Sequence, residues 1–237
     1  MRKHVLVSLA ATVALAFSLA ASAQELTGVA IGGVQYSPDS SYTYAGMLKS
    51  FPGGRLGEGW YSKVIASWLT YRYDTNISGT DYEIRARAPG IEGGVGYGWK
   101  RDRYTLSLSG SIGLRHITVK PIVPDNEETG NVWTFNPQLQ GTFALTPKIE
   151  AGTLASYAFG QKSAYAQARL AWKPSGTWFV GLQEIYLKGR NYRINQHGIV
   201  VGRPLANGYT LEISGGRSRP RDSDSTGYIA FGLSRVF

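Results

Sequence analysis

The sequence predicts an all-β fold, namely an antiparallel transmembrane β-barrel of the outer-membrane type with about 12 strands, for which 10 and 14 are the alternatives. Apolar and polar residues alternate with a period of two along most of the chain after Gln24, and apolar residues at helical spacing do not persist. Trp and Tyr residues gather near the expected strand ends, and the chain closes on an amphipathic strand that ends in Phe237. These three observations favour a barrel whose apolar face meets lipid.

Composition limits the class of protein further. The chain has 237 residues, with 30 Gly, 15 Tyr, 6 Trp and no Cys, and only 17% of its residues are charged. These figures exclude a disordered chain, a disulfide-stabilised domain, and a metal site or nucleophile that depends on Cys. The length suits a single domain.

Residues 1–23 have the pattern of a secretory signal peptide. The segment 1–4 is basic, 5–19 is apolar apart from small polar residues, and 21–23 offers small side chains to a signal peptidase. A membrane-anchoring helix is the alternative, but the apolar run is short for a bilayer core of about 30 Å. We therefore expect residues 24–237 to form one barrel domain in the bacterial outer membrane.

Clusters of Gly, Pro, Asp and Asn divide this domain into the expected strands. The alternation is clear in 103–118, where Leu106, Leu108 and Ile112 are flanked by serines, and it recurs in 148–160 and 163–173. In chain order the expected strands are 26–37, 41–51, 59–73, 80–99, 103–118, 131–144, 148–160, 163–173, 176–188, 191–203, 207–217 and 225–237.

The fourth expected strand, 80–99, does not keep its apolar residues on one face. Its apolar residues lie at even positions before Pro89-Gly90 and at odd positions after it, which a β-bulge at Pro89-Gly90 would explain. A hairpin there would give an odd number of strands, so the bulge is the prediction. Further along, Gly94, Gly96 and Gly98 share one face, and we expect this stripe to admit a large side chain inside the barrel.

Aromatic residues distinguish a membrane barrel from a soluble periplasmic β domain, which is the alternative fold. If the first strand runs outward, the inner belt contains Trp60, Tyr61, Tyr97, Trp99, Tyr104, Trp172, Trp178 and Tyr209. The outer belt then contains Tyr71, Tyr73, Tyr82, Trp133, Tyr186 and Tyr192. The same orientation makes the inner turns short, with the exception of 52–59.

Charged residues on the polar faces are expected to form a network in the lumen, made of Glu83, Arg85, Arg87, Arg115, Glu150, Arg169, Arg193 and Glu212. Mixed signs would form salt bridges that plug a narrow barrel. The alternative is an arginine constriction that passes anions. The aromatic residues Tyr71, Tyr73 and Trp133 are expected either to stack on a glycan or to belong to the belt.

The two histidines of the mature chain are the candidates for catalysis. Hydrolysis would need a nucleophile and a base within hydrogen-bond reach. The parity of its strand places His116 on the lipid side, and His197 is expected in the lumen beside Arg193 and Asn195. We expect both to be structural, and the protein to be non-enzymatic, with no catalytic residues, cofactor or metal. An outer-membrane lipid-modifying enzyme remains an alternative.

The last segment predicts how the barrel is assembled. Ile229, Phe231 and Leu233 alternate with smaller or polar residues up to Phe237, a pattern similar to the signal by which outer-membrane barrels are recognised for insertion. Arg235 interrupts the apolar face only at the interface, where its side chain can snorkel. We expect Phe237 to act as the assembly signal.

Several motifs resemble the BcsS family of bacterial cellulose-biosynthesis proteins. They are Tyr42-Thr43-Tyr44-Ala45-Gly46, Phe51-Pro52-Gly53-Gly54-Arg55-Leu56, Gly59-Trp60, Tyr71-Arg72-Tyr73, Gly96-Tyr97 and Pro124-Asp125. The resemblance implies an outer-membrane accessory of cellulose synthesis, secretion or surface attachment, with cellulose and its export proteins as partners. It carries over no active-site residue. A small anion-preferring channel is the alternative function.

The formal net charge of +9 indicates that the basic side chains bind an acidic partner. Export removes nucleic acid from reach, so outer-membrane lipid and lipopolysaccharide are the expected partners of Lys and Arg at the outer end. The sequence leaves the oligomeric state open.

Overall fold

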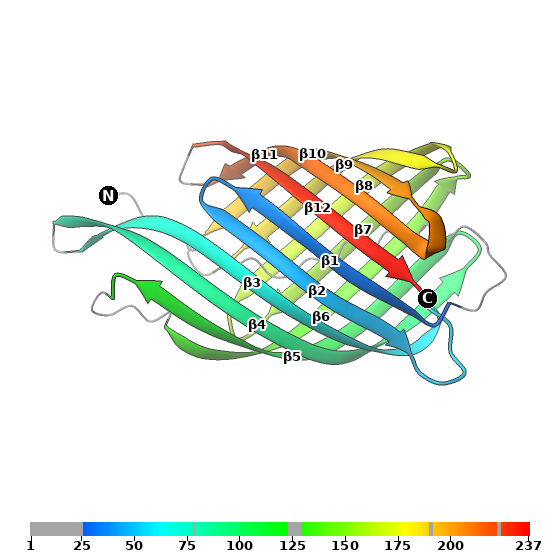
Figure 1. The fold of residues 1–237 in the computed structure, drawn as a ribbon, viewed down its shortest axis with the longest axis horizontal. Helices are drawn as coiled ribbons and strands as arrows, with labels where there is room; N and C mark the ends of the chain where they lie inside the picture. Colours follow the sequence, from blue (N-terminus) through cyan, green and yellow to red (C-terminus); the bar gives the residue numbers. More distant parts are fainter. Residues whose placement is uncertain (1–25, 78, 123–128, 190–191, 222–223) are drawn as a thin grey trace.

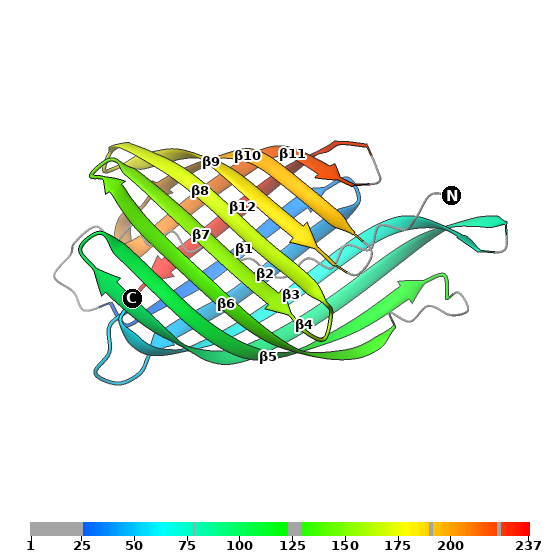
Figure 2. The same cartoon turned by 180° about the vertical axis from the view of Figure 1, so that it is seen from behind.

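The computed structural model describes residues 26–77, 79–122, 129–189, 192–221 and 224–237, so the expected signal peptide lies outside the described residues. The chain forms one closed antiparallel barrel in which each strand pairs with its sequence neighbours and β1 pairs with β12 (Figures 1 and 2). The strands are β1 (Gly28–Ser37), β2 (Ser40–Ser50), β3 (Gly59–Ile77), β4 (Thr80–Arg101), β5 (Tyr104–Lys120), β6 (Gly130–Thr146), β7 (Ile149–Ala158), β8 (Ser163–Ser175), β9 (Trp178–Lys188), β10 (Arg193–Pro204), β11 (Tyr209–Pro220) and β12 (Thr226–Val236).

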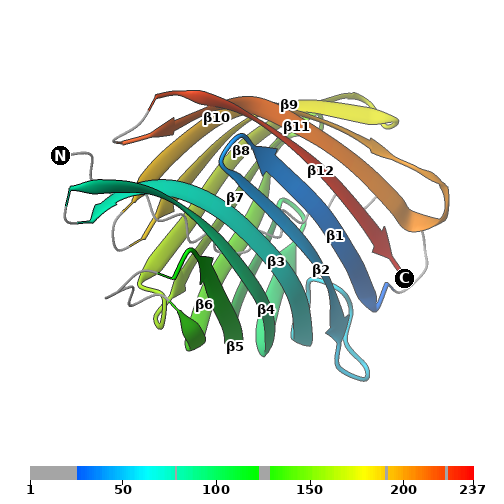
Figure 3. The same cartoon turned by 60° about the vertical axis from the view of Figure 1, so that its left-hand side comes forward.

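The prediction of twelve strands is confirmed. A short 3₁₀ helix, Ala206–Gly208, joins β10 to β11, and no helix among the described residues is long and apolar enough to span a bilayer. We call the end where β1 begins and β12 finishes the inner end, and the opposite end the outer end. Figure 3 brings the outer end forward and shows the strands arranged around one interior.

Alternate residues of each strand face outward or into the lumen. The outward face carries large exposed apolar side chains, such as Ile112 at 63% exposure and Leu182 at 65%. Inward residues of the same strands, such as Ser111 and Gln183, are buried. An apolar outward face is the arrangement that a lipid environment requires.

The predicted bulge at Pro89-Gly90 is wrong. The register between β3 and β4 is continuous from Gly59↔Gly98 to Ile77↔Thr80, so the even positions of β4 face the lumen throughout. Ile84, Ala86 and Ala88 are therefore inside the barrel, although they are apolar. The backbone therefore does not shift. The apolar residues change from even to odd positions because they face the lumen at the outer end of β4 and face outward nearer the inner end.

Strands β3 and β4 extend beyond their neighbours at the outer end. Pairing with β2 stops at Ser40↔Tyr71 and pairing with β5 stops at Arg85↔Lys120, whereas β3 and β4 remain paired to Ile77↔Thr80. The result is a two-stranded projection, which we call the arm and define as residues 72–84 (Figure 1).

The inner aromatic belt is confirmed in most of its members. Trp60, Trp99, Tyr104, Trp172 and Trp178 are exposed on the outward face, and Trp60 and Tyr97 make an edge contact with ring centroids 5.3 Å apart. Tyr61 is buried inside the barrel, so it does not belong to the belt. At the outer end the prediction is wrong for Tyr71 and Tyr192, which are buried, and for Tyr73, which packs inward on apolar residues of the lumen. Exposed aromatic residues there are Tyr36, Trp68, Tyr82, Trp133, Phe135, Tyr157 and Phe159.

Candidate functional site

The lumen is the first candidate site, and apolar residues fill its outer half. Inward side chains from eight strands, together with Tyr192, pack into one cluster, which we call the outer apolar cluster. Strands on opposite sides of the barrel contribute to it. Its buried members are Tyr42, Leu69, Tyr71, Ile84, Ala86, Ala88, Val119, Leu154, Tyr165, Ile185, Leu187, Tyr192 and Ile194.

A first polar network lies below this cluster and links β3, β4 and β6. Lys63 Nζ lies 3.5 Å from Glu92 Oε1 and donates a hydrogen bond of 3.2 Å to Gln138 Oε1. Asn136 Nδ2 donates to Glu92 Oε2 at 2.7 Å. The Lys63 side chain is only 2% exposed, so its charge depends on these partners.

A second polar network crosses the lumen between β8 and β11. Arg169 Nη1 donates to both carboxylate oxygens of Glu212, at 3.1 and 3.3 Å. Arg169 Nη2 donates to Gln183 Oε1 at 3.4 Å, and Gln183 Nε2 donates to the Tyr228 hydroxyl at 3.0 Å. The Arg169–Glu212 and Gln183–Tyr228 bonds join strands that are not neighbours in the sheet, so they link two sides of the barrel, whereas Arg169 and Gln183 lie opposite each other on the paired strands β8 and β9.

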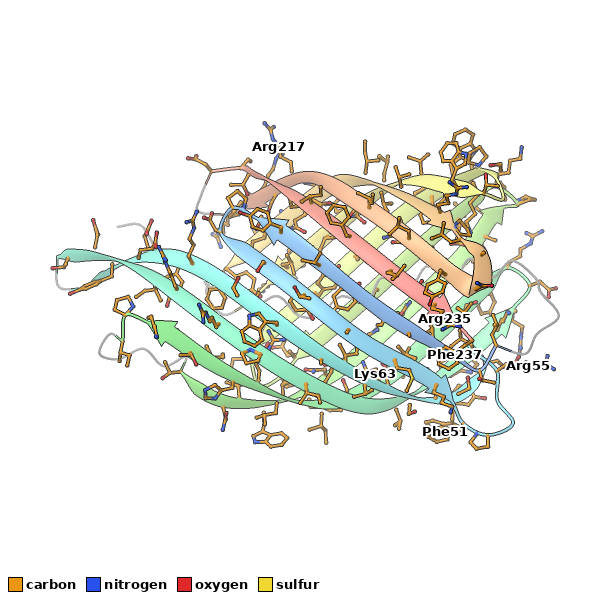
Figure 4. The ribbon with its side chains drawn as sticks, viewed as in Figure 1. Phe51, Arg55, Lys63, Arg217, Arg235 and Phe237 are labelled. Carbon is orange, nitrogen blue, oxygen red and sulfur yellow. The ribbon has the colours of Figure 1, made fainter. Side chains whose placement is uncertain are left out.

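Apolar residues also line the lumen at the inner end. Val29, Ile31, Leu48, Tyr61 and Ile65 form an inner cluster together with Leu56. Leu56 belongs to the loop 51–58 between β2 and β3, whose Leu56 N–H donates to the Leu26 carbonyl at 2.8 Å. The one inner connection that is long therefore folds over the mouth and adds an apolar side chain to the interior. Phe51 and Arg55 of this loop lie at the same end as Phe237 (Figure 4).

The glycine stripe of β4 makes room for one of these side chains. A Cβ at Gly96 would collide with the ring of Tyr61 and with the Cβ of Ser109. The prediction that the stripe admits a large side chain into the barrel is confirmed at Gly96.

Small cavities lined by described residues lie between these layers. One, of about 40 Å³, is lined by Ser67, Glu92, Arg115 and Asn136 among others, and the second, of about 80 Å³, is lined by Tyr44, Arg169, Gln183 and Glu212 among others. Each has room for a few water molecules. Neither has room for a sugar ring.

Four of the eight charged residues predicted for the lumen lie there. Arg115 donates to Ser67 Oγ at 3.2 Å, Arg169 binds Glu212, and Glu150 accepts a 2.8 Å hydrogen bond from Lys173 Nζ. The prediction missed Lys63, Glu92 and Lys173. Glu92 shares its parity with Gly94, Gly96 and Gly98, which were expected to face the interior, so this signal could have identified it.

The prediction is wrong for Glu83, Arg85, Arg87 and Arg193, which face outward. At the outer end, the inward positions of their strands are occupied by apolar residues of the outer apolar cluster, so the charged residues that alternate with them face outward. Arg85 Nε donates to Glu83 Oε1 at 2.7 Å, and this hydrogen bond holds the pKa of the exposed Glu83 carboxyl below its usual range. At the same end, a hydrogen bond to Asp39 raises the pKa of Arg72.

Both histidines lie on the outward face. His116 is there as predicted, with Nδ1 2.7 Å from Asn131 Oδ1. His197 was expected in the lumen, but it lies outside with Nδ1 3.5 Å from Glu184 Oε2. The lumen position is taken by its neighbour Gln196. Among the described residues, no group of three His, Cys, Asp or Glu could hold a metal ion.

The three candidate glycan-stacking residues are not together. Tyr71 is 5% exposed within the outer apolar cluster and stacks on Tyr73, with ring centroids 6.1 Å apart. The expected exposure of Tyr71 is therefore wrong. Trp133 is 66% exposed and faces outward on β6, which places it in the outer belt.

Phe237 lies where the barrel closes. Its N–H donates to the Gly28 carbonyl at 3.0 Å, its carbonyl accepts from Thr27 N–H at 2.7 Å and Gly28 N–H at 2.9 Å, and its ring lies over Gly28. Beside it, the Arg235 guanidinium lies 5.1 Å from the centre of the Tyr209 ring, in a cation–π contact.

Comparisons with solved structures show the same kind of fold. The COG4313 outer membrane channel from Pseudomonas putida F1 matches with a TM-score of 0.57 and 12% identity, over 95% of this chain and 100% of that one. The KdgM porin matches with a TM-score of 0.54 and 10% identity, over 88% and 99% of the two chains. The translocator domain of the autotransporter NalP from Neisseria meningitidis matches with a TM-score of 0.55 and 12% identity, over 89% of each chain.

These likenesses establish an outer-membrane type of barrel and leave the function open. No curated protein matches the sequence. A family model does match, over residues 29–237, which is nearly all of the barrel. The chain therefore belongs to the BcsS family of cellulose biosynthesis proteins.

Proposed function

We propose that this protein is a non-enzymatic outer-membrane accessory of cellulose biosynthesis, and that it assists secretion or surface attachment of the polymer from outside the cell. The observation that carries the proposal is that inward side chains of the described residues form two apolar clusters and two polar networks inside the barrel. Such an interior does not favour passage of a hydrated glucan chain. The family membership supplies the link to cellulose.

The arm is the part of the barrel that we propose reaches the polymer. It projects beyond the neighbouring strands, and its inward residues Tyr73 and Ile84 pack on the outer apolar cluster, which anchors its base. Asp74, Asp81 and Tyr82 are exposed on the paired part of the arm. Residues with hydrogen-bonding groups and aromatic rings suit contact with a polyhydroxylated chain.

Shortening the arm tests this proposal. Tyr73 and Ile84 are paired, so residues 74–83 can be replaced by Asn-Gly, which favours a two-residue hairpin turn. We expect the variant to insert normally and surface cellulose to fall severalfold relative to total cellulose, measured in a deletion strain that carries the variant gene.

The matched control shortens another outer hairpin. Ser218 and Thr226 are paired, so residues 219–225 can be replaced by Asn-Gly in the same way. We expect this control to retain surface cellulose. If both variants insert and both retain it, or if both lose it equally, the role of the arm is refuted.

Conductance separates the accessory role from a small anion-preferring channel. Heat-modifiable protein reconstituted in planar bilayers is expected to give no steady current, because the cavities of about 40 and 80 Å³ are separate and small. A porin in the same bilayer serves as the positive control. Discrete anion-selective steps would favour the channel instead.

A further inference from the structure

The outer face of the barrel has a concavity of about 1120 Å³ where β3, β4 and β5 pass the outer belt. The turn between β1 and β2 also lines it. Most of its lining residues face outward, and Tyr71 and Ala86 of the outer apolar cluster also line it. Its lining includes Trp68, Arg72, Arg85, Arg87, His116 and Lys120.

Strand register places three cations in one row across this surface. Arg72 of β3 lies directly opposite Arg85 of β4, and Arg85 lies directly opposite Lys120 of β5. Residues opposite each other in an antiparallel sheet have Cβ atoms about 5 Å apart, and like charges there repel. A bound anion would relieve this repulsion.

The adjacent row adds one more cation and two hydroxyl groups. Arg87 lies opposite Thr70 on one side and opposite Thr118 on the other. All three residues line the concavity. A guanidinium between two hydroxyls can donate several hydrogen bonds to the oxygens of a phosphate.

Carboxylates neutralise only part of this charge. Arg72 Nε donates to Asp39 Oδ1 at 3.0 Å, and Arg85 Nε donates to Glu83 Oε1 at 2.7 Å. These are the two acidic residues of the lining, against the four cations Arg72, Arg85, Arg87 and Lys120. The concavity therefore keeps a net positive charge.

The position of these cations relative to the outer belt indicates which kind of anion they would bind. Arg87 pairs with Thr70, two residues beyond the outward Trp68 of the outer belt, or about 7 Å along the strand. Below Trp68 the same face is apolar, with Ile91 and Ile112 exposed. The cations thus lie at the level of lipid headgroups, directly above a surface that suits acyl chains.

We propose that this concavity binds the phosphate groups of lipid A in the outer leaflet, with the acyl chains lying along β3, β4 and β5. Arg87 and Lys120 hold the phosphates, and Arg72 and Arg85 add positive charge from the same rows. The site does not depend on the proposed role in cellulose secretion, because the arm variant that lacks residues 74–83 keeps all four cations.

Binding of diphosphorylated lipid A to the purified barrel in neutral detergent tests the site, with bound lipid counted by native mass spectrometry. Each cation near a membrane surface contributes about fivefold in affinity, so the double variant Arg87→Gln, Lys120→Gln should bind about 25-fold more weakly. The control Arg103→Gln, Lys148→Gln removes two exposed cations from inner turns and should bind normally.

Two further ligands distinguish the source of the anion. Enzymatically dephosphorylated lipid A should bind wild type as weakly as diphosphorylated lipid A binds the double variant. Oligogalacturonate, an acidic glycan without acyl chains, should not compete with lipid A. Equal loss in the inner-turn control, no loss in the double variant, or displacement by the acidic glycan would each overturn the proposal. Because all four substituted residues are exposed, heat-modifiable protein is expected from every variant.

Discussion

Glu92→Ala is expected to lower the free energy of unfolding by about 3–5 kcal/mol, the cost of leaving one partner of a buried ion pair uncompensated. Lys63 would lose its carboxylate while its own side chain is 2% exposed, and Asn136 would lose its 2.7 Å acceptor. Urea titration of the folded barrel in micelles, followed by the heat-modifiable band and by Trp fluorescence, measures the change.

Two variants show whether the loss comes from the unpaired charge. Glu83→Ala removes the same residue type from the same strand, but Glu83 is exposed in its pair with Arg85, so its unfolding midpoint should stay near that of wild type. Lys63→Met combined with Glu92→Met removes both charges and should recover most of the stability. A double variant as unstable as Glu92→Ala would mean that packing, and not the charge, explains the effect.

Phe237→Ala is expected to reduce the amount of inserted barrel severalfold, while surface cellulose per inserted molecule stays near wild type. The Phe237 backbone closes the sheet onto β1, and the ring lies over Gly28, so the side chain holds the first and last strands together at the inner end. The arm lies at the opposite end of the barrel. Heat-modifiable protein and surface cellulose, quantified in the same cells, give the two values.

Phe51→Ala is the matched control for Phe237→Ala. Phe51 is 45% exposed at the same end, against 42% for Phe237, but it lies in the loop after β2. We expect it to leave insertion unchanged. Normal insertion of Phe237→Ala with loss of cellulose would place the function at the inner end and would contradict the proposed role of the arm.

The strands themselves could be predicted from the sequence because two local signals coincide. Gly, Pro, Asp and Asn residues mark the turns, and alternation marks the stretches between them, so β5 and β8 were recognised within a few residues of their observed ends. The inner belt could also be predicted, because Trp60, Trp99 and Trp172 lie at strand ends that share one orientation. The family motifs lie within these same strands and turns, apart from Pro124-Asp125, which lies outside the described residues.

Which face of a strand is inside could be decided only by the tertiary structure. Alternation defines two faces of a strand but does not show which of them faces the lumen. Where a strand extends beyond the bilayer, its outward face can be polar and its inward face apolar, the reverse of the arrangement within the bilayer. In β4, Ile84 is inside because it packs in the outer apolar cluster, whereas Arg85 is exposed on the outward face, where it pairs with Glu83. The pairing of Lys63 with Glu92, and the cation row from Arg72 to Lys120, likewise exist only once the register of neighbouring strands brings distant residues side by side.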